Sequence, residues 1–121
     1  MVILDTNMML RYFLNDVKEM ADEAEKMIKA GNANVTIEVV AEAVYVLRDV
    51  YEMKRKEVAD LLRSFLSLVG CPDKAVLDLA LRTYGNRKLD FVDCILYSYH
   101  RIRGDEIVTF DKALKKLLVH N

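Results

Sequence analysis

Four acidic residues stand where a carboxylate could bind a metal ion. Asp5 and Asp111 each follow a short apolar run, whereas Glu42 and Asp93 each lie inside a strongly hydrophobic stretch. An unpaired carboxylate costs on the order of several kcal/mol to bury, so Glu42 and Asp93 need a partner, a proton or a cation. Carboxylates that converge on one pocket repel each other unless a cation lies between them. Such oxygen ligands favour Mg²⁺ or Mn²⁺ over zinc.

Each of these acids also has a simpler structural explanation, and these alternatives stay open. Asp111 could cap the last helix, and Asp5 could cap the first one. Glu42 could pair with an arginine or cap a backbone group. Asp90 could cap the helix that contains Asp93, whose place in the first turn suits the helix dipole. The case for a site therefore depends on whether the four acids come together.

The spacing of apolar residues predicts short strands that alternate with longer helices. Strands are expected at residues 2–4, 34–37 and 106–110, with a further short one at 69–72. Helices are expected at 8–14, 17–30, 38–51, 54–68, 73–84, 90–103 and 111–118, with a polar loop at 85–89. Thr6 and Asn7 should start the first helix, and Gly31 and Gly104 should end two others.

This alternation predicts the α/β class, with three α/β/α layers and a short central parallel sheet covered by helices on both faces. In such folds, ligands collect beyond the carboxyl ends of the strands. Asp5 and Asp111 both follow predicted strands. We therefore expect a site at the edge of the sheet where these two residues lie.

Composition is that of a folded globular chain. The sequence has 121 residues, of which 53% are hydrophobic and 31% charged, and we expect one domain spanning 1–121. The apolar stretches are shorter than a membrane span and the N-terminus does not resemble a signal peptide, so we expect a cytoplasmic protein with no membrane partner. The net charge of −1 lacks the basic excess usual in nucleic-acid binders. Cys71 and Cys94 are isolated in the sequence and should be reduced thiols rather than zinc ligands.

Four motifs around the acidic residues occur in a fixed order along the chain. They are Val2-Ile3-Leu4-Asp5-Thr6-Asn7, Val40-Ala41-Glu42, Asp90-Phe91-Val92-Asp93 and Val108-Thr109-Phe110-Asp111. In order and spacing they resemble the PIN-domain family, and within it the VapC-like toxins of toxin–antitoxin pairs. By this resemblance Asp5, Glu42, Asp93 and Asp111 form a catalytic, metal-binding quartet, with Asp5 and Asp93 as the direct ligands. Asn7, Thr109 and Asp90 would orient those carboxylates or water.

The resemblance also implies an activity, a cofactor and partners. It implies an endoribonuclease that uses Mg²⁺ or Mn²⁺ to cleave single-stranded RNA, leaving a 5′-phosphate and a 3′-hydroxyl. It further implies a small antitoxin protein and a homodimer, for which the apolar helix faces around Tyr45 and Tyr51 are candidates. Candidate contacts to the substrate are Arg11, Arg48, Arg82, Arg87, Lys88 and Lys112.

Two other functions remain possible on the sequence alone. An inactive PIN-like module would bind a partner or nucleic acid without cutting it, although such a module has no need of four converging acids. A phosphoryl-transfer enzyme of the haloacid dehalogenase type also opens with a strand and an aspartate, but it resembles Asp-x-Asp, and position 7 here is Asn. Two departures from the PIN pattern are Cys94 in place of the frequent Ala and a final strand limited to about residues 119–120.

Overall fold

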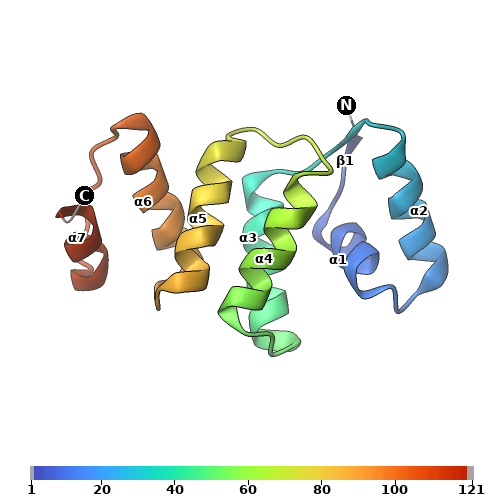
Figure 1. The fold of residues 1–121 in the computed structure, drawn as a ribbon, viewed down its shortest axis with the longest axis horizontal. Helices are drawn as coiled ribbons and strands as arrows, with labels where there is room; N and C mark the ends of the chain where they lie inside the picture. The colour runs from blue at the N-terminus through green and yellow to red at the C-terminus, as the bar shows by residue number, and fades with distance from the viewer. Residues whose placement is uncertain (1, 120–121) are drawn as a thin grey trace.

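The computed structural model describes residues 2–119 (Figure 1). Its strands are β1 (Val2–Ile3) and β2 (Ala33–Asn34), which pair in parallel, and a single bridge joins Asn34 to Gly70. Its helices are α1 (Thr6–Leu14), α2 (Lys18–Lys29), α3 (Ile37–Tyr45), α4 (Arg55–Leu66), α5 (Lys74–Asn86), α6 (Phe91–Arg103) and α7 (Lys112–Val119), and a π-helical turn η1 (Val46–Val50) continues α3. The predicted α/β class with a short parallel sheet is confirmed, and the structure is consistent with three layers.

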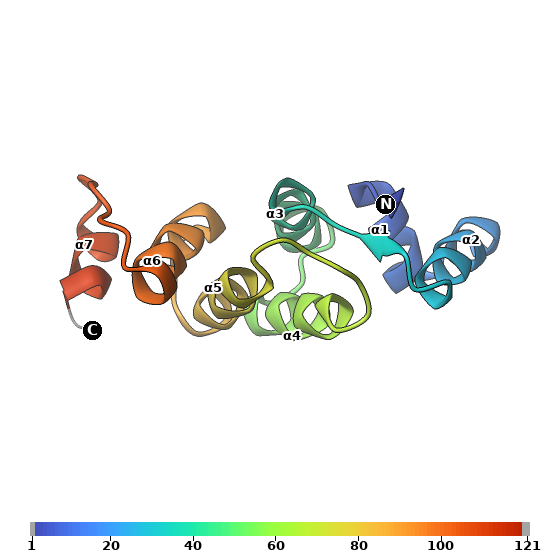
Figure 2. The ribbon, with the colours of Figure 1, turned by 90° about the horizontal axis from the view of Figure 1, so that it is seen from above.

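The elements are arranged in an elongated row. Figures 1 and 2 show β1, α1 and α2 at one end and α6 and α7 at the other, with α3, α4 and α5 between them. Within the row α1 packs on α2, α4 on α5, and α5 on α6. Helix α3 also packs on both α1 and α6, so it links the segment that follows Asp5 with the helix that contains Asp93.

One hydrophobic cluster runs through this row. It includes Leu4 after β1, Leu47 in η1, Phe65 in α4, Leu77 in α5 and Leu114 in α7, each at most 1% exposed. The buried positions recur at three- and four-residue intervals along each helix, which is the spacing that places side chains on one helical face. The cores of the two ends are thus continuous.

Short polar side chains and glycine set the helix ends. Asp5 caps α1, because its Oδ1 accepts a hydrogen bond from the Met8 amide at 2.9 Å. The prediction that Thr6 and Asn7 cap this helix was wrong, since both lie inside α1 and Thr6 is buried. Gly104 ends α6 as predicted, with a φ of +76° that a side chain would disfavour.

Several predicted boundaries shift because side-chain caps compete with strands. The strand predicted at 34–37 ends at Asn34, since Thr36 Oγ1 accepts a hydrogen bond from the Val39 amide at 3.2 Å and starts α3. The strand predicted at 69–72 is reduced to the bridge at Gly70. The loop predicted at 85–89 begins later, because α5 continues through Gly85 to Asn86.

The largest error concerns the strand predicted at 106–110. These residues form no strand, and the side chains of Val108 and Phe110 are 87% and 96% exposed. The physical reason is that α6 leads the chain away from the sheet, so no neighbouring strand lies beside this segment to complete its hydrogen bonds (Figure 1). Of the final strand expected near 119–120, Val119 belongs to α7, and residue 120 lies outside the described residues.

The remaining expectations about the chain concern membranes and thiols. Among residues 2–119 no helix is both long enough and apolar enough to pass through a bilayer. Cys71 and Cys94 are both free thiols, half-buried and buried respectively. Burial raises the pKa of Cys94 to about 12, so this thiol stays protonated at neutral pH.

Candidate active site

A cavity of about 800 Å³ opens between α3, η1, α4 and the start of α6. Its lining residues are Ala41, Val44, Tyr45, Arg48, Asp49, Arg55, Tyr84, Asp90, Phe91, Val92 and Asp93. Acidic side chains enter it from α6 and η1, and arginines enter it from η1 and α4. The cavity therefore offers oxygen ligands for a cation and positive charge for an anion.

Asp93 is the acid with the most perturbed surroundings in this cavity. It is half-buried in the first turn of α6. Burial raises the pKa of Asp93 above its usual 3.8, and the negative charges of Asp111 and then Asp90 raise it further. Three acidic groups thus share one electrostatic neighbourhood, where a bound cation would relieve their repulsion.

Arg55 holds one wall of the cavity. Its Nε donates a hydrogen bond to the Tyr84 carbonyl at 2.9 Å, and its second amino group donates to the Leu89 carbonyl. Its guanidinium also lies 3.7 Å from the centre of the Tyr84 ring, a cation–π distance. Because Leu89 directly precedes Asp90, Arg55 fixes the chain where it enters α6. This role could not be predicted from the sequence, since Arg55 stands in a run of charged residues typical of a surface.

Asp111 begins α7 beside α6. Its Oδ1 accepts a hydrogen bond from the Leu114 amide at 2.8 Å, so the capping role considered for it is real. Thr109 Oγ1 accepts a hydrogen bond from the Asp111 amide at 3.0 Å, which fixes the backbone from which this carboxylate projects. One Oδ of Asp111 remains for another partner, because a carboxylate has two acceptor oxygens.

Asp5 and Glu42 are not among the residues that line the cavity. Asp5 is exposed at the start of α1, and Glu42 is exposed on α3. Glu42 had been expected within the core, but its neighbours Val40 and Ala43 are fully buried while its own side chain faces outward. Tyr45, three residues further along α3, lines the cavity, so Glu42 lies on the same side of the helix as the cavity wall.

The four predicted acids come from four separate segments of the chain. Asp93 and Asp111 lie near each other, since the charge of Asp111 contributes to the raised pKa of Asp93. Among residues 2–119, no three Asp, Glu, His or Cys side chains are grouped so that they could hold a metal ion. Joint metal binding by Asp5, Glu42, Asp93 and Asp111 stays a prediction.

The residues expected to support the ligands are also split between the two ends. Asn7 is exposed in the first turn of α1, beside Asp5 in the sequence. Asp90 lines the cavity at the start of α6, where its side chain makes no capping hydrogen bond. Thr109 contacts Asp111 as described above. Each therefore lies beside the acid that its motif assigns to it.

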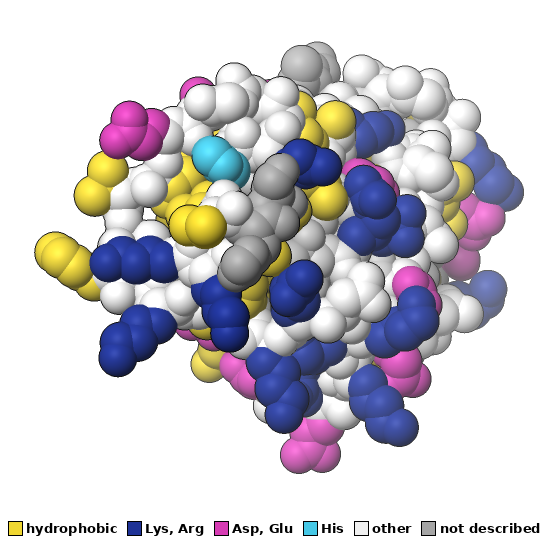
Figure 3. Space-filling model, turned by 60° about the vertical axis from the view of Figure 1, so that its left-hand side comes forward, with side chains coloured by type: hydrophobic (Ala, Val, Ile, Leu, Met, Phe, Trp, Pro, Cys, Tyr) yellow, Lys and Arg dark blue, Asp and Glu magenta, His cyan; other side chains and the backbone are white. Residues whose placement is uncertain are grey.

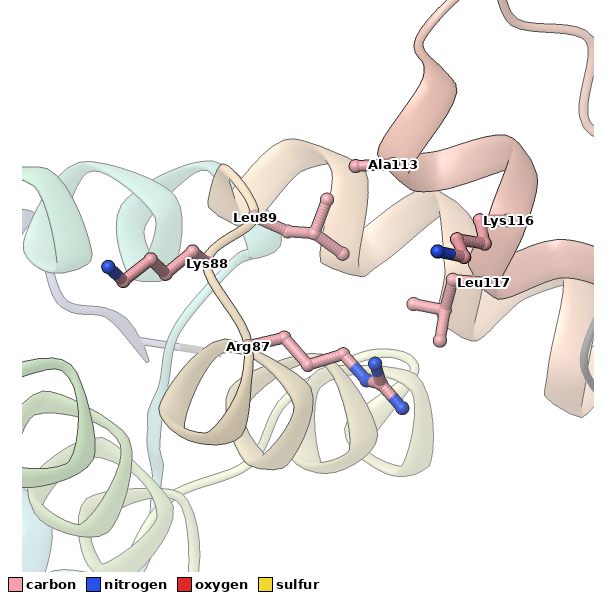
Figure 4. Close-up of a pocket in the computed structure, with 6 residues that line it drawn as sticks. All are labelled: Arg87, Lys88, Leu89, Ala113, Lys116 and Leu117. Atoms are coloured by element: carbon pink, nitrogen blue, oxygen red, sulfur yellow. The ribbon is translucent and has the colours of Figure 1, made fainter.

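Positive side chains gather around a second cavity, next to α7. This cavity of about 410 Å³ is lined by Arg87, Lys88, Leu89, Ala113, Lys116 and Leu117 (Figure 4). Figure 3 shows Lys and Arg side chains spread over the surface on this side of the molecule. Arg87 and Lys88 were candidate substrate contacts, whereas Lys116 was missed because a lysine in the last helix has no distinguishing pattern.

Other candidate substrate contacts are engaged elsewhere. Arg11 forms an ion pair with Asp16 at 2.6 Å, and Arg82 forms one with Asp78 at 3.1 Å. Arg48 lines the acidic cavity and donates only a long hydrogen bond, of 3.4 Å, to the Met53 carbonyl. Arg48 is thus a candidate substrate contact that lines the same cavity as Asp90 and Asp93.

Comparison with known families agrees with this arrangement. The family model described as "PIN domain" matches residues 2–118. The chain belongs to the PIN domain family, a nuclease fold whose members are typically metal-dependent. No curated protein and no solved structure shows a significant match to the chain.

Proposed function

We propose that this protein is a divalent-metal-dependent endoribonuclease that cleaves single-stranded RNA. The observation that carries the proposal is the PIN match over residues 2–118, together with an acid-lined cavity at the position of the third motif. Asp90 and Asp93 enter that cavity beside Arg48, so acidic and phosphate-binding groups occur side by side. A phosphodiesterase needs both kinds of group.

The proposed metal ligands are Asp5, Glu42, Asp93 and Asp111, with Mg²⁺ or Mn²⁺ as the cation. A divalent cation supplies a polarised phosphoryl oxygen and an activated water in such reactions. Among residues 2–119 no three of these side chains are grouped as a metal site would be. The roles of this chain's residues are therefore assigned by their positions: acids at the cavity, Arg48 at its wall, and Asn7 and Thr109 beside Asp5 and Asp111.

The cavity beside α7 supports a polyanionic substrate. Arg87, Lys88 and Lys116 line it, the side chains of Arg87 and Lys116 extend on the side of α7 while that of Lys88 extends away from it, and none of its lining residues is acidic (Figure 4). An RNA backbone passing from the acidic cavity along the 87–89 segment would meet these charges. Binding through phosphates weakens as salt is raised, so this contact should be strongly salt-dependent.

A toxin role is the finer part of the proposal. The VapC-like order of the four motifs supports it, and it requires a small antitoxin that blocks the acidic cavity with a basic side chain. Such a toxin acts on cytoplasmic RNA, and we place the protein in the cytoplasm on that ground. Co-expression of a neighbouring small reading frame that relieves growth arrest by this chain is the direct test of the role.

Cleavage of a mixed transfer and ribosomal RNA pool tests the enzymatic proposal. The wild-type chain is incubated with Mg²⁺, Mn²⁺ or a chelator, and the product ends are sequenced. We expect metal-dependent products with 5′-phosphates, lost in Asp5→Asn and Asp93→Asn but kept in the control Asp60→Asn, which changes an exposed acid on α4. Cleavage that survives both Asp5→Asn and Asp93→Asn refutes the proposal. RNA binding without metal-dependent cleavage in the wild type points instead to an inactive PIN-like module.

A further inference from the structure

The acidic cavity has an aromatic side chain at its mouth. Tyr45 lines the cavity and is 63% exposed, and within the described part of the chain its ring has no aromatic or cationic partner. Val92, at the start of α6, lines the same cavity and is 60% exposed. Because α3 and α6 pack on each other, apolar side chains from two neighbouring helices border one opening. Tyrosine is enriched at binding interfaces, since its ring is apolar and its hydroxyl polar.

A positive charge stands about one helical turn after this ring. Arg48 follows Tyr45 by three residues, which is the spacing of neighbours on one helical face, and both side chains line the cavity. Among residues 2–119 the Arg48 guanidinium forms no ion pair, and it donates only the hydrogen bond of 3.4 Å to the Met53 carbonyl. A guanidinium presents a fork of N–H donors that matches the oxygens of a phosphate. Arg48 therefore has donors left for such a group.

Tyr84 of α5 contributes a third group. This residue is only 4% exposed, yet it lines the cavity. Within residues 2–119 its hydroxyl makes no hydrogen bond, although its backbone carbonyl accepts one from Arg55. Burial raises the pKa of this hydroxyl, against the opposing charges of Arg55 and Arg48, so the group keeps its proton and can donate. A largely buried donor without a partner loses free energy that an oxygen of a ligand would restore.

We infer that Tyr45 stacks against one unpaired base of the bound strand, and that Arg48 and the Tyr84 hydroxyl hold the phosphate next to that base. The inference rests on the proposed function and assigns strand binding to side chains outside the four acidic motifs. The cavity of about 800 Å³ falls within the roughly 300–1,000 Å³ of sites that enclose small ligands, so it has room for one nucleotide.

This binding mode selects single strands and positions their phosphate. Every base has a π-face, so stacking on Tyr45 favours an unpaired base of any kind over a base that is paired within a duplex. Asp90 and Asp93 line the same cavity from the start of α6. A phosphate held by Arg48 and Tyr84 would therefore lie in the cavity that these acids enter.

Tryptophan fluorescence tests the stacking without any cleavage. The sequence contains no tryptophan, so Tyr45→Trp places a single indole at the mouth of the cavity. We expect its fluorescence to be quenched by a short single-stranded RNA, in chelator or with Ca²⁺ as the oxygen-binding cation, and not by the same strand annealed to its complement. Tyr51→Trp is the matched control, because Tyr51 is exposed but does not line the cavity, and it should show no quenching.

Fluorescence anisotropy of a labelled single strand separates the three contacts. Tyr45→Ala should weaken binding roughly 5- to 150-fold, the range of one base–aromatic contact, with unchanged salt dependence, whereas Tyr45→Phe should bind as the wild type does. Arg48→Ala should weaken binding and lower the slope of log Kd against log salt by roughly 0.7, the value for one phosphate of a single strand. Tyr84→Phe should weaken binding roughly tenfold at an unchanged melting temperature, because its hydroxyl has no partner within residues 2–119.

Several results would contradict this binding mode. Equal quenching in Tyr45→Trp and Tyr51→Trp, equal quenching by single strand and duplex, or wild-type affinity in Tyr45→Ala overturns the stacking, and wild-type affinity in both Arg48→Ala and Tyr84→Phe overturns the phosphate contacts. A wild type that binds no strand in either chelator or Ca²⁺ overturns both. If light scattering shows that Tyr45→Ala loses mass together with strand binding, the ring belongs to a contact between copies and the inference fails. A wild type that binds as expected but cuts no RNA with Mg²⁺ or Mn²⁺ overturns the nuclease proposal alone.

Discussion

Replacing Arg55 with methionine should destabilise the fold and loosen the entrance to α6. Methionine keeps the apolar stem but removes the hydrogen bonds to the Tyr84 and Leu89 carbonyls and the cation–π contact at 3.7 Å. Hydrogen bonds from a charged donor contribute roughly 1.5–3 kcal/mol each, and the cation–π contact about 0.5–1 kcal/mol. Because the freed carbonyls regain some water through the open cavity, we expect a net loss of roughly 2–4 kcal/mol.

Urea denaturation followed by circular dichroism measures this loss, and thermal melting should show a fall of roughly 10–15 °C for a domain of this size. The matched control is Arg101→Met, on the exposed surface of α6, where we expect a change within about 0.5 kcal/mol. Arg55→Lys keeps the charge but not the forked geometry and should lie between the two. Equal stability of Arg55→Met and Arg101→Met would refute the assigned role of Arg55 in holding the start of α6.

Three further predictions follow from burial and charge. Phe65 is 1% exposed and packs edge-on to Phe13 with 5.0 Å between ring centres. Phe65→Ala should therefore lower the free energy of unfolding in urea by roughly 3–5 kcal/mol. A smaller loss for Phe65→Ala than for Phe65→Leu would contradict this packing. Cys71 should react with a thiol reagent in the folded protein, and Cys94, with a pKa of about 12, only after unfolding; two equally fast thiols would argue against this burial. In chelator, Asp93→Asn should stabilise the protein at pH 7. The pKa of Asp93 is raised in the folded state. Ionisation of Asp93 therefore lowers the free energy of unfolding: this loss is absent below the usual pKa of 3.8 and is complete once the pH exceeds the raised pKa of the folded state. Melting curves of both proteins at pH 3 and pH 7 check this, and an equal difference at both values would be inconsistent with it.

Much of the fold could be predicted because local signals and burial agree. Val2-Ile3 before Asp5, and the apolar spacing in α4 and α6, identified the parallel strand and the main helices. The resemblance to the PIN-domain family was likewise confirmed over residues 2–118, whereas the VapC-like subtype stays a prediction. Boundaries failed where a capping side chain competes with a strand, as Thr36 does, since the two uses of one residue differ by little free energy.

The segment 106–110 shows what the sequence could not predict. Its composition is that of a strand, but a strand requires a neighbour, and which neighbour is available depends on where α6 leads the chain. For the same reason the motifs identified the four acids without fixing how their side chains lie relative to one another. The structural role of Arg55 was missed because this side chain donates its hydrogen bonds to two backbone carbonyls far along the sequence, those of Tyr84 and Leu89.

Manganese binding tests most directly whether the acids of the separate motifs serve one cation. Calorimetric titration of the wild-type protein with Mn²⁺ should show a site that is lost in Asp5→Asn and equally in Asp93→Asn, although Asp5 caps α1 and Asp93 lies in the first turn of α6. Asp60→Asn should bind as the wild type does. Undiminished Mn²⁺ binding in either Asp5→Asn or Asp93→Asn would contradict the account.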